Sequence, residues 1–136
     1  MKLWKNYLEN NKDKMITIDD FINQMITFFP WTQSETDEHT NKFGERLSTI
    51  VIEDIIMPNV IETIKKQEKQ KTKCIFDYFE QVSIDADDNL RNIFSITVLE
   101  ILGNDANILE IAKQYMGPKT AQYQKQADLD LGRIRG

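Results

Sequence analysis

Cysteine and histidine are nearly missing from this sequence, whose 136 residues hold one of each, Cys74 and His39. A single cysteine excludes an intrachain disulfide and a cysteine-based zinc cage. The only possible cysteine–histidine nucleophile pair joins these two residues. Cys74 opens an apolar segment and is expected to be a buried structural thiol, whereas His39 is expected at the surface near a helix start. We therefore expect no enzymatic activity, no bound metal and no cofactor.

Long apolar runs are also missing. No stretch approaches the 18 or so apolar residues that a membrane span needs, and the N-terminal segment has no apolar core of the kind found in signal peptides. These absences predict a cytoplasmic protein without membrane association. The richness in lysine, isoleucine and asparagine is typical of an AT-rich bacterial or phage genome.

Glycine and proline are scarce, at five and three residues, which argues against an all-β domain with many turns. Apolar residues instead recur with helical spacing. Such spacing is found at residues 3–8, 18–29, 43–55, 60–64, 75–82, 90–102, 108–116 and 119–131. The 90–102 segment is apolar nearly all round, which predicts a helix buried on most sides. We predict one compact all-α domain over residues 1–136, with about six to seven helices, antiparallel helix pairs in the C-terminal half and a frayed tail at 132–136.

Helix boundaries can be placed from local signals. Thr17 and Asp20 form a capping-box pattern, and Pro30 ends the helix that follows them. Residues 31–37 read as a loop, and a helix is expected from about residue 38. The β-branched residues 49–52 could form a strand, but the helical period before them favours helix. Pro58 is expected in the first turn of a helix, and Asp87 or Asp88 is expected to cap the start of the 90–102 helix. Gly103 is expected to end that helix, with Asn104 or Asp105 as the cap of the next one. Gly117 and Pro118 are expected to end the 108–116 helix.

Three segments resemble known ligand-binding motifs but lack features that those motifs require. Asp85, Asp87 and Asn89 have the spacing of a calcium loop, but Leu90 replaces the required glycine and Ile96 the required glutamate. Residues 117–120 resemble the end of a phosphate loop that lacks its upstream glycine. Residues 101–116 resemble a helix-turn-helix, yet the second helix carries more acid than base, which opposes binding to a phosphate backbone.

Charge is distributed unevenly along a chain whose net charge is −5. Residues 65–73 hold five lysines and one glutamate, and residues 74–112 hold eight acids against one base, Arg91. The basic run is expected to be a solvated helix end or linker, with a partner or nucleic-acid contact as the alternative. The acidic block would attract a basic protein. Its candidate partner-binding residues are Asp85, Asp87, Asp88, Asp105 and Glu110.

Trp31 follows Pro30 in a polar segment. Tryptophan is favoured both in cores and as an interface anchor. We expect its ring to fold back on the helix ends, and we keep it as a candidate partner-binding residue in case it is exposed.

Residues 74–132 carry a recurring combination: an F-x-x-x-E helix, a polar acidic turn, a V-L-E-x-L helix and a Tyr-Met-Gly-Pro-Lys-Thr close. This combination resembles a family of small bacterial domains without assigned activity, similar to immunity proteins that neutralise toxins by binding them. The resemblance implies a non-enzymatic inhibitor of a basic toxin such as a nuclease. The alternative is a structural or adaptor domain of a phage or regulatory assembly, which could form a dimer through its apolar helices.

Overall fold

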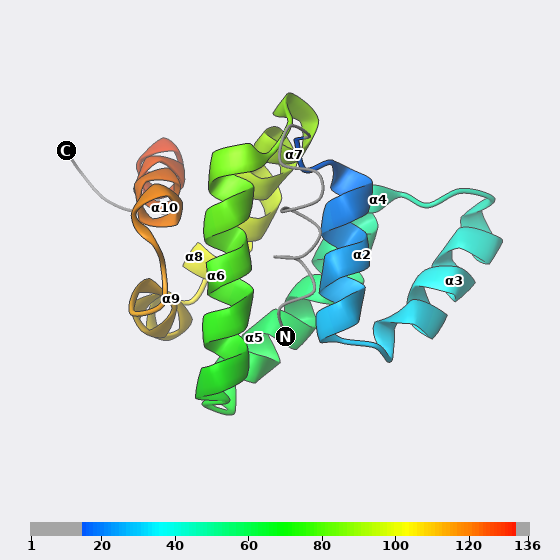
Figure 1. Ribbon diagram of the computed structural model, residues 1–136, viewed down its shortest axis with the longest axis horizontal. Coiled ribbons are helices and arrows are strands. Elements are labelled where there is room, and N and C mark those ends of the chain that lie inside the picture. Colours follow the sequence, from blue (N-terminus) through cyan, green and yellow to red (C-terminus); the bar gives the residue numbers. More distant parts are fainter. Residues whose placement is uncertain (1–14, 133–136) are drawn as a thin grey trace.

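Helices make up nearly all of the structure, a computed structural model that describes residues 15–132 (Figure 1). Among these residues α4, η1 and α5 run on without interruption, as do α7, η2 and α8, which gives seven continuous helices and confirms the predicted all-α fold. The predicted helix at 3–8, and the predicted tail beyond Gly132, lie outside the described residues. The elements in chain order are α2 (Ile18–Phe28), α3 (Thr32–Phe43), α4 (Ser48–Ile50), η1 (Val51–Ile56), α5 (Met57–Lys65), α6 (Lys69–Asp85), α7 (Asp88–Ile93), η2 (Phe94–Val98), α8 (Leu99–Gly103), α9 (Ala106–Lys113) and α10 (Pro118–Asp130).

The start of α2 is fixed by its own side chains and by the turn between α6 and α7. Thr17 and Asp20 form the predicted capping box, with the Thr17 N–H donating to Asp20 Oδ2 at 3.0 Å and the Asp20 N–H to Thr17 Oγ1 at 3.2 Å. Just before it, Ile16 pairs with Ala86 in an isolated parallel bridge. The helix therefore begins where its sequence predicts, and its first residues are attached to a distant turn.

The later helix boundaries depend on the same local chemistry. The Asp87 carboxylate accepts the Leu90 N–H at 2.8 Å at the start of α7. Asp105 accepts two N–H groups of α9, those of Asn107 at 2.8 Å and Ile108 at 3.2 Å. These two caps were predicted, and both satisfy backbone donors that a helix start leaves without partners.

Two π-helical segments, η1 and η2, lie in the middle of the two longest composite helices and contact each other. Their backbone bonds reach one residue further than in an α-helix: the Met57 N–H donates to the Ile52 carbonyl and the Leu99 N–H to the Phe94 carbonyl. Pro58 supplies a reason for η1, since it has no N–H and crowds the carbonyl four residues earlier. The β-branched residues 49–52 are thus helical, as predicted, but partly in the π form.

The core centres on aromatic rings from three helices. Phe21 of α2 stacks on Phe79 of α6 at a centroid distance of 6.2 Å, and Phe79 meets Phe94 of η2 edge-on at 5.3 Å. All three side chains are almost completely buried. Edge and offset contacts of this kind add to the stabilisation from apolar burial, so η2 is held against α2 and α6.

The prediction of a loop at residues 31–37 was wrong, because α3 begins at Thr32. Its buried positions, Thr32 and Thr36, are threonines whose hydroxyls donate to backbone carbonyls at 2.6 and 2.8 Å. The expected continuous helix from about residue 38 is also broken, since Gly44 ends α3 with a φ of +77°, a conformation that favours glycine. Figure 1 shows α3 at one edge of the molecule, opposite α9 and α10.

The basic run at 65–73 is divided between two helix ends. Lys65 closes α5, and Lys69 opens α6, which is longer than the predicted 75–82 helix. The run therefore covers two helix ends and the turn between them, and four of its five lysines are exposed, while Lys71 is half-buried. Within residues 15–132, none of the helices is both long and apolar enough to cross a membrane.

Candidate functional site

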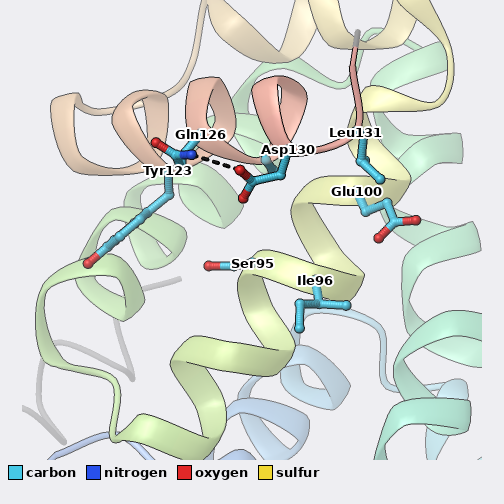
Figure 2. A pocket seen from close by; sticks show the side chains of 8 residues that line it. Ser95, Ile96, Glu100, Tyr123, Gln126, Asp130 and Leu131 are labelled. Atoms are coloured by element: carbon cyan, nitrogen blue, oxygen red, sulfur yellow. Dashed lines mark hydrogen bonds between the residues drawn. The ribbon is translucent and has the colours of Figure 1, made fainter.

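An open groove lies along η2 and α8, with α10 on one side and Glu53 of η1 on the other. It consists of two adjoining hollows of 280 and 470 Å³ that share Ile96 and Glu100. In Figure 2, residues of α10 line one side of the first hollow, and residues of η2 and α8 line the other. The lining residues are Glu53, Ser95, Ile96, Thr97, Glu100, Ile101, Asn104, Tyr123, Gln126, Ala127, Asp130 and Leu131.

The groove combines exposed apolar side chains with an acidic rim. Ile96 is 57% exposed and Leu131 is 46% exposed, although both belong to residue types that are usually buried. Glu53 of η1, Glu100 of α8 and Asp130 of α10 supply carboxylates, and no lysine or arginine is present among the described residues that line it. We call Glu53, Ile96, Glu100, Asp130 and Leu131 the acidic groove.

The position of α10, one wall of the groove, is set by a glutamate from another helix. Glu80 of α6 accepts the N–H groups of Lys119 and Thr120 at 3.0 and 2.9 Å, and also the Thr120 hydroxyl at 2.9 Å. A carboxylate at the N-terminal end of α10 interacts favourably with the positive end of the helix dipole. A Cβ on Gly117 would lie only 2.5 Å from Glu80 Cδ, so glycine is needed there for this contact.

A second tie joins α10 to α8 beneath the groove. Gln124 is 1% exposed, and its Nε2 donates to the Leu99 carbonyl and to Asp128 Oδ1, both at 3.0 Å. Together with the Glu80 contact, these hydrogen bonds fix the position of α10 relative to the beginning of α8.

The five acids predicted to bind a partner lie in two separate groups. Asp85, Asp87 and Asp88 lie at the α6–α7 turn, whereas Asp105 and Glu110 lie beyond the far end of the 88–103 helix. At about 1.5 Å of rise per residue, the two groups are roughly 25 Å apart. A partner would therefore have to span about 25 Å to contact both groups, and the acidic face stays a prediction.

Most of these acids also have local structural contacts. Asp87 and Asp105 cap the starts of α7 and α9, and Asp85 accepts from Gln81 Nε2 at 2.8 Å. Asp88 pairs with Arg91 at 3.3 Å and its side chain is 99% exposed. Counting acids along the sequence thus overstates the charge that is available to a partner.

Trp31 folds back on the helix ends as expected, but its side chain is 54% exposed and so does not belong to the buried core. The ring still lies against its neighbours: Nε1 donates to Asn59 Oδ1 at 2.9 Å, and the Phe29 ring is 5.6 Å away, centroid to centroid. The side chain is held in place while about half of its surface faces solvent.

Sequence reasoning missed Glu53, Ile96 and Asp130 as functional candidates. Ile96 belongs to the segment that was expected to be buried on most sides, and the other two are far from it in the chain. One signal was present, because Asn92 and Glu100 flank Ile96 at the four-residue spacing that places side chains on one helix face. A polar row that contains a single isoleucine indicates an exposed apolar residue.

His39 and Cys74, the two residues considered as a nucleophile pair, both have contacts within the fold. His39 Nε2 accepts the Leu47 N–H at 3.2 Å and connects α3 to the segment before α4. Cys74 is half-buried against the core rather than fully buried as expected. Over residues 15–132, no three histidine, cysteine, aspartate or glutamate side chains are grouped so that they could hold a metal ion.

The fold and the groove define an all-helical domain with an acidic, partly apolar surface groove. A family model described as a domain of unknown function, DUF7674, matches residues 22–130, and the chain belongs to this family. The match also covers most of the N-terminal half of the chain, and the family description assigns no function. Nothing among the curated proteins and nothing among the solved structures matches the chain.

Proposed function

We propose that this chain is a non-enzymatic protein-binding domain whose acidic groove takes a basic, amphipathic segment of a partner. The observation that carries the proposal is the combination of exposed Ile96 and Leu131 with the carboxylates of Glu53 and Asp130, in a groove whose described lining has no base. The domain would act as an immunity- or antitoxin-like inhibitor of a basic bacterial toxin such as a nuclease.

The chemistry of the groove favours such a partner. Burying an isoleucine or leucine side chain contributes about 1.5–3 kcal/mol, which gives affinity to a segment with apolar residues on one face. Carboxylates on the rim attract lysine and arginine, speed association and discriminate against acidic partners. A nuclease surface that binds the phosphate backbone is basic, so a segment of it would match both features. The resemblance to immunity proteins points in the same direction.

The test begins with a partner captured from the native host and identified. The toxic or nuclease activity of this partner is then measured with and without the wild-type domain, and we expect the domain to inhibit it. A partner whose activity is unchanged by a saturating amount of the domain would contradict the inhibitor role.

Kinetics with groove variants test the surface itself. The variant Ile96→Ser with Asp130→Lys should bind the partner at least about tenfold more weakly, and its association should lose most of its salt dependence. Both positions are exposed, and a lysine near the end of α10 suits the helix dipole. The matched control, Lys65→Gln with Lys69→Gln, should bind like the wild type. Loss of binding in the control but not in the groove variant would overturn the proposal.

Reversing the charge of Asp85, Asp87 and Asp88 together would be a less clear experiment. Because Asp87 caps α7, its replacement would weaken a helix start by about 1 kcal/mol and confuse binding with stability. The exposed Asp88 alone can be reversed, and we expect its reversal to change association less than the groove variant does.

A second candidate is an adaptor domain that connects two partners in a phage or regulatory assembly. The observation in its favour is that Trp31 and the lysines of the α5–α6 turn are exposed, on elements that do not line the groove, and that the lysines carry the opposite charge to its rim. Gene context discriminates between the two, because a toxin gene immediately upstream favours the inhibitor.

A further inference from the structure

Trp31 is an exposed aromatic side chain with a fixed orientation. Its Nε1–H is bonded to Asn59 Oδ1, and the Asn59 amide in turn donates from Nδ2 to the Ile55 carbonyl at 2.8 Å. The buried Phe29 ring meets it at an interplanar angle of 64°. A partner that packs on this ring would not have to order it first, and preorganised tryptophans are frequent anchors of protein interfaces.

A lysine from the basic run lies beside this ring. Lys71 Nζ is 4.6 Å from the centroid of Phe29 and 5.0 Å from that of Trp31, within the range of a cation–π contact. The basic run has no aromatic residue within its own sequence. The fold supplies one, because the junction of α2 and α3 packs against the beginning of α6.

The other lysines of the run divide into two groups. Lys66 pairs with Glu62 at 3.7 Å, and Lys73 pairs with Asp77 at 3.1 Å. Lys65 and Lys69 are exposed and have no ion pair within residues 15–132. Within the described part of the chain, the α5–α6 turn therefore keeps positive charge that no acid neutralises through an ion pair, at the start of the helix that brings Lys71 to Trp31.

We propose that Trp31, Lys65, Lys69 and Lys71 form a second docking surface, which we call the tryptophan surface, for a short acidic segment of a partner protein. An apolar or aromatic residue of this segment would pack on the Trp31 ring, and its carboxylates would pair with the lysines. The inference does not depend on the acidic groove. If both surfaces bind their partners, the domain can connect a basic protein to an acidic one.

A short peptide fits this surface better than a nucleic acid does. Glu68 interrupts the lysines, Glu62 and Asp77 border them, and the whole chain carries a net charge of −5. A continuous phosphate backbone would pass over these acids and be repelled. A segment of a few residues can place its carboxylates at the lysines alone.

The experiment uses the full chain and a library of 12-residue peptides displayed on phage. Selection on the wild type should enrich peptides that combine aspartate or glutamate with an aromatic or aliphatic residue, and selection on Trp31→Ala should lose them. One enriched peptide, labelled with fluorescein, is then titrated by anisotropy. We expect Trp31→Ala and Lys69→Gln with Lys71→Gln each to weaken its binding at least about tenfold.

The controls separate the two surfaces and the competing occupants. Ile96→Ser with Asp130→Lys should bind the acidic peptide like the wild type, so failure of the groove proposal leaves this result intact. Absence of acidic peptides from the selection, or equal enrichment on Trp31→Ala, would overturn the inference. Two other results would also overturn it. One is that a 12-nucleotide single-stranded oligothymidine binds more tightly than the peptide and loses this binding in Trp31→Ala. The other is that the wild type self-associates in sedimentation experiments and Trp31→Ala does not.

Discussion

The acidic groove and the tryptophan surface differ in charge and in what supports them. Directly beneath the groove, Phe94, Val98 and Leu99 are at most 1% exposed, and α10 is tied to the rest of the molecule through Glu80 and Gln124. The tryptophan surface lies where α3 leaves the core, and the buried positions of α3 are threonines. The groove is thus coupled to global stability, whereas the tryptophan surface can be altered with little effect on folding.

Removing the packing beneath the groove should have the largest effect. Phe94→Ala deletes a ring that contacts Phe21 and Phe79, and we expect a loss of about 3–5 kcal/mol in the free energy of unfolding. Urea denaturation followed by circular dichroism measures this loss. The exposed neighbour is the control, since Ile96→Ala should change stability by no more than about 0.5 kcal/mol. Similar losses at both positions would mean that the Phe94 side of η2 does not face the core.

Displacing one wall of the groove should have an intermediate effect. Gly117→Ala pushes the Glu80 carboxylate away from the start of α10, and we expect it to cost about 1–3 kcal/mol through hydrogen bonds lost by a partly buried charged group. The φ of Gly117 is −75°, which alanine adopts without strain, so the effect is steric. A double-mutant cycle tests the contact, because Gly117→Ala should reduce the free energy of unfolding less in a Glu80→Ala background. An equal reduction in both backgrounds would refute the contact.

Changing the tryptophan surface should have the smallest effect on stability. Trp31→Ala removes an exposed hydrogen bond to Asn59 and part of the contact with Phe29, and we expect a loss of about 0.5–1 kcal/mol. Thermal unfolding of this variant next to the wild type measures it. A loss above about 2 kcal/mol would show that the ring acts as a core residue, and would remove the contrast between the two surfaces.

Local features of the fold could be predicted from the sequence because each depends on a few neighbouring residues. The Thr17–Asp20 capping box, the caps at Asp87 and Asp105 and the turn at Gly117–Pro118 are of this kind. The start of α3 was missed because its buried face is made of threonines, which leave no apolar period. The π segments were missed because a shift of one residue in the hydrogen-bond pattern leaves composition unchanged.

The candidate surfaces depend on contacts between distant parts of the chain. Glu53, Ile96 and Asp130 line the groove from three helices, and Lys71 meets Trp31 across 40 positions of sequence. The acids counted in residues 74–112 were misleading for a related reason. Glu80, Asp87 and Asp105 all contact helix starts, and a negative group stabilises a helix start whether or not a partner is present.

The two π segments have a consequence for changes in chain length. Each π segment contains one residue more than an α-helix that joins the same two flanking turns. Deleting Ser95 should therefore turn the 88–103 helix into a regular α-helix. Leu90 and Leu102 would keep their places in the core. A deletion elsewhere in that helix would rotate the residues after it by about 100° and expose Leu102. A relative that lacks the extra residue of η2 would therefore keep the fold, while the side chains of η2 that line the groove would change places.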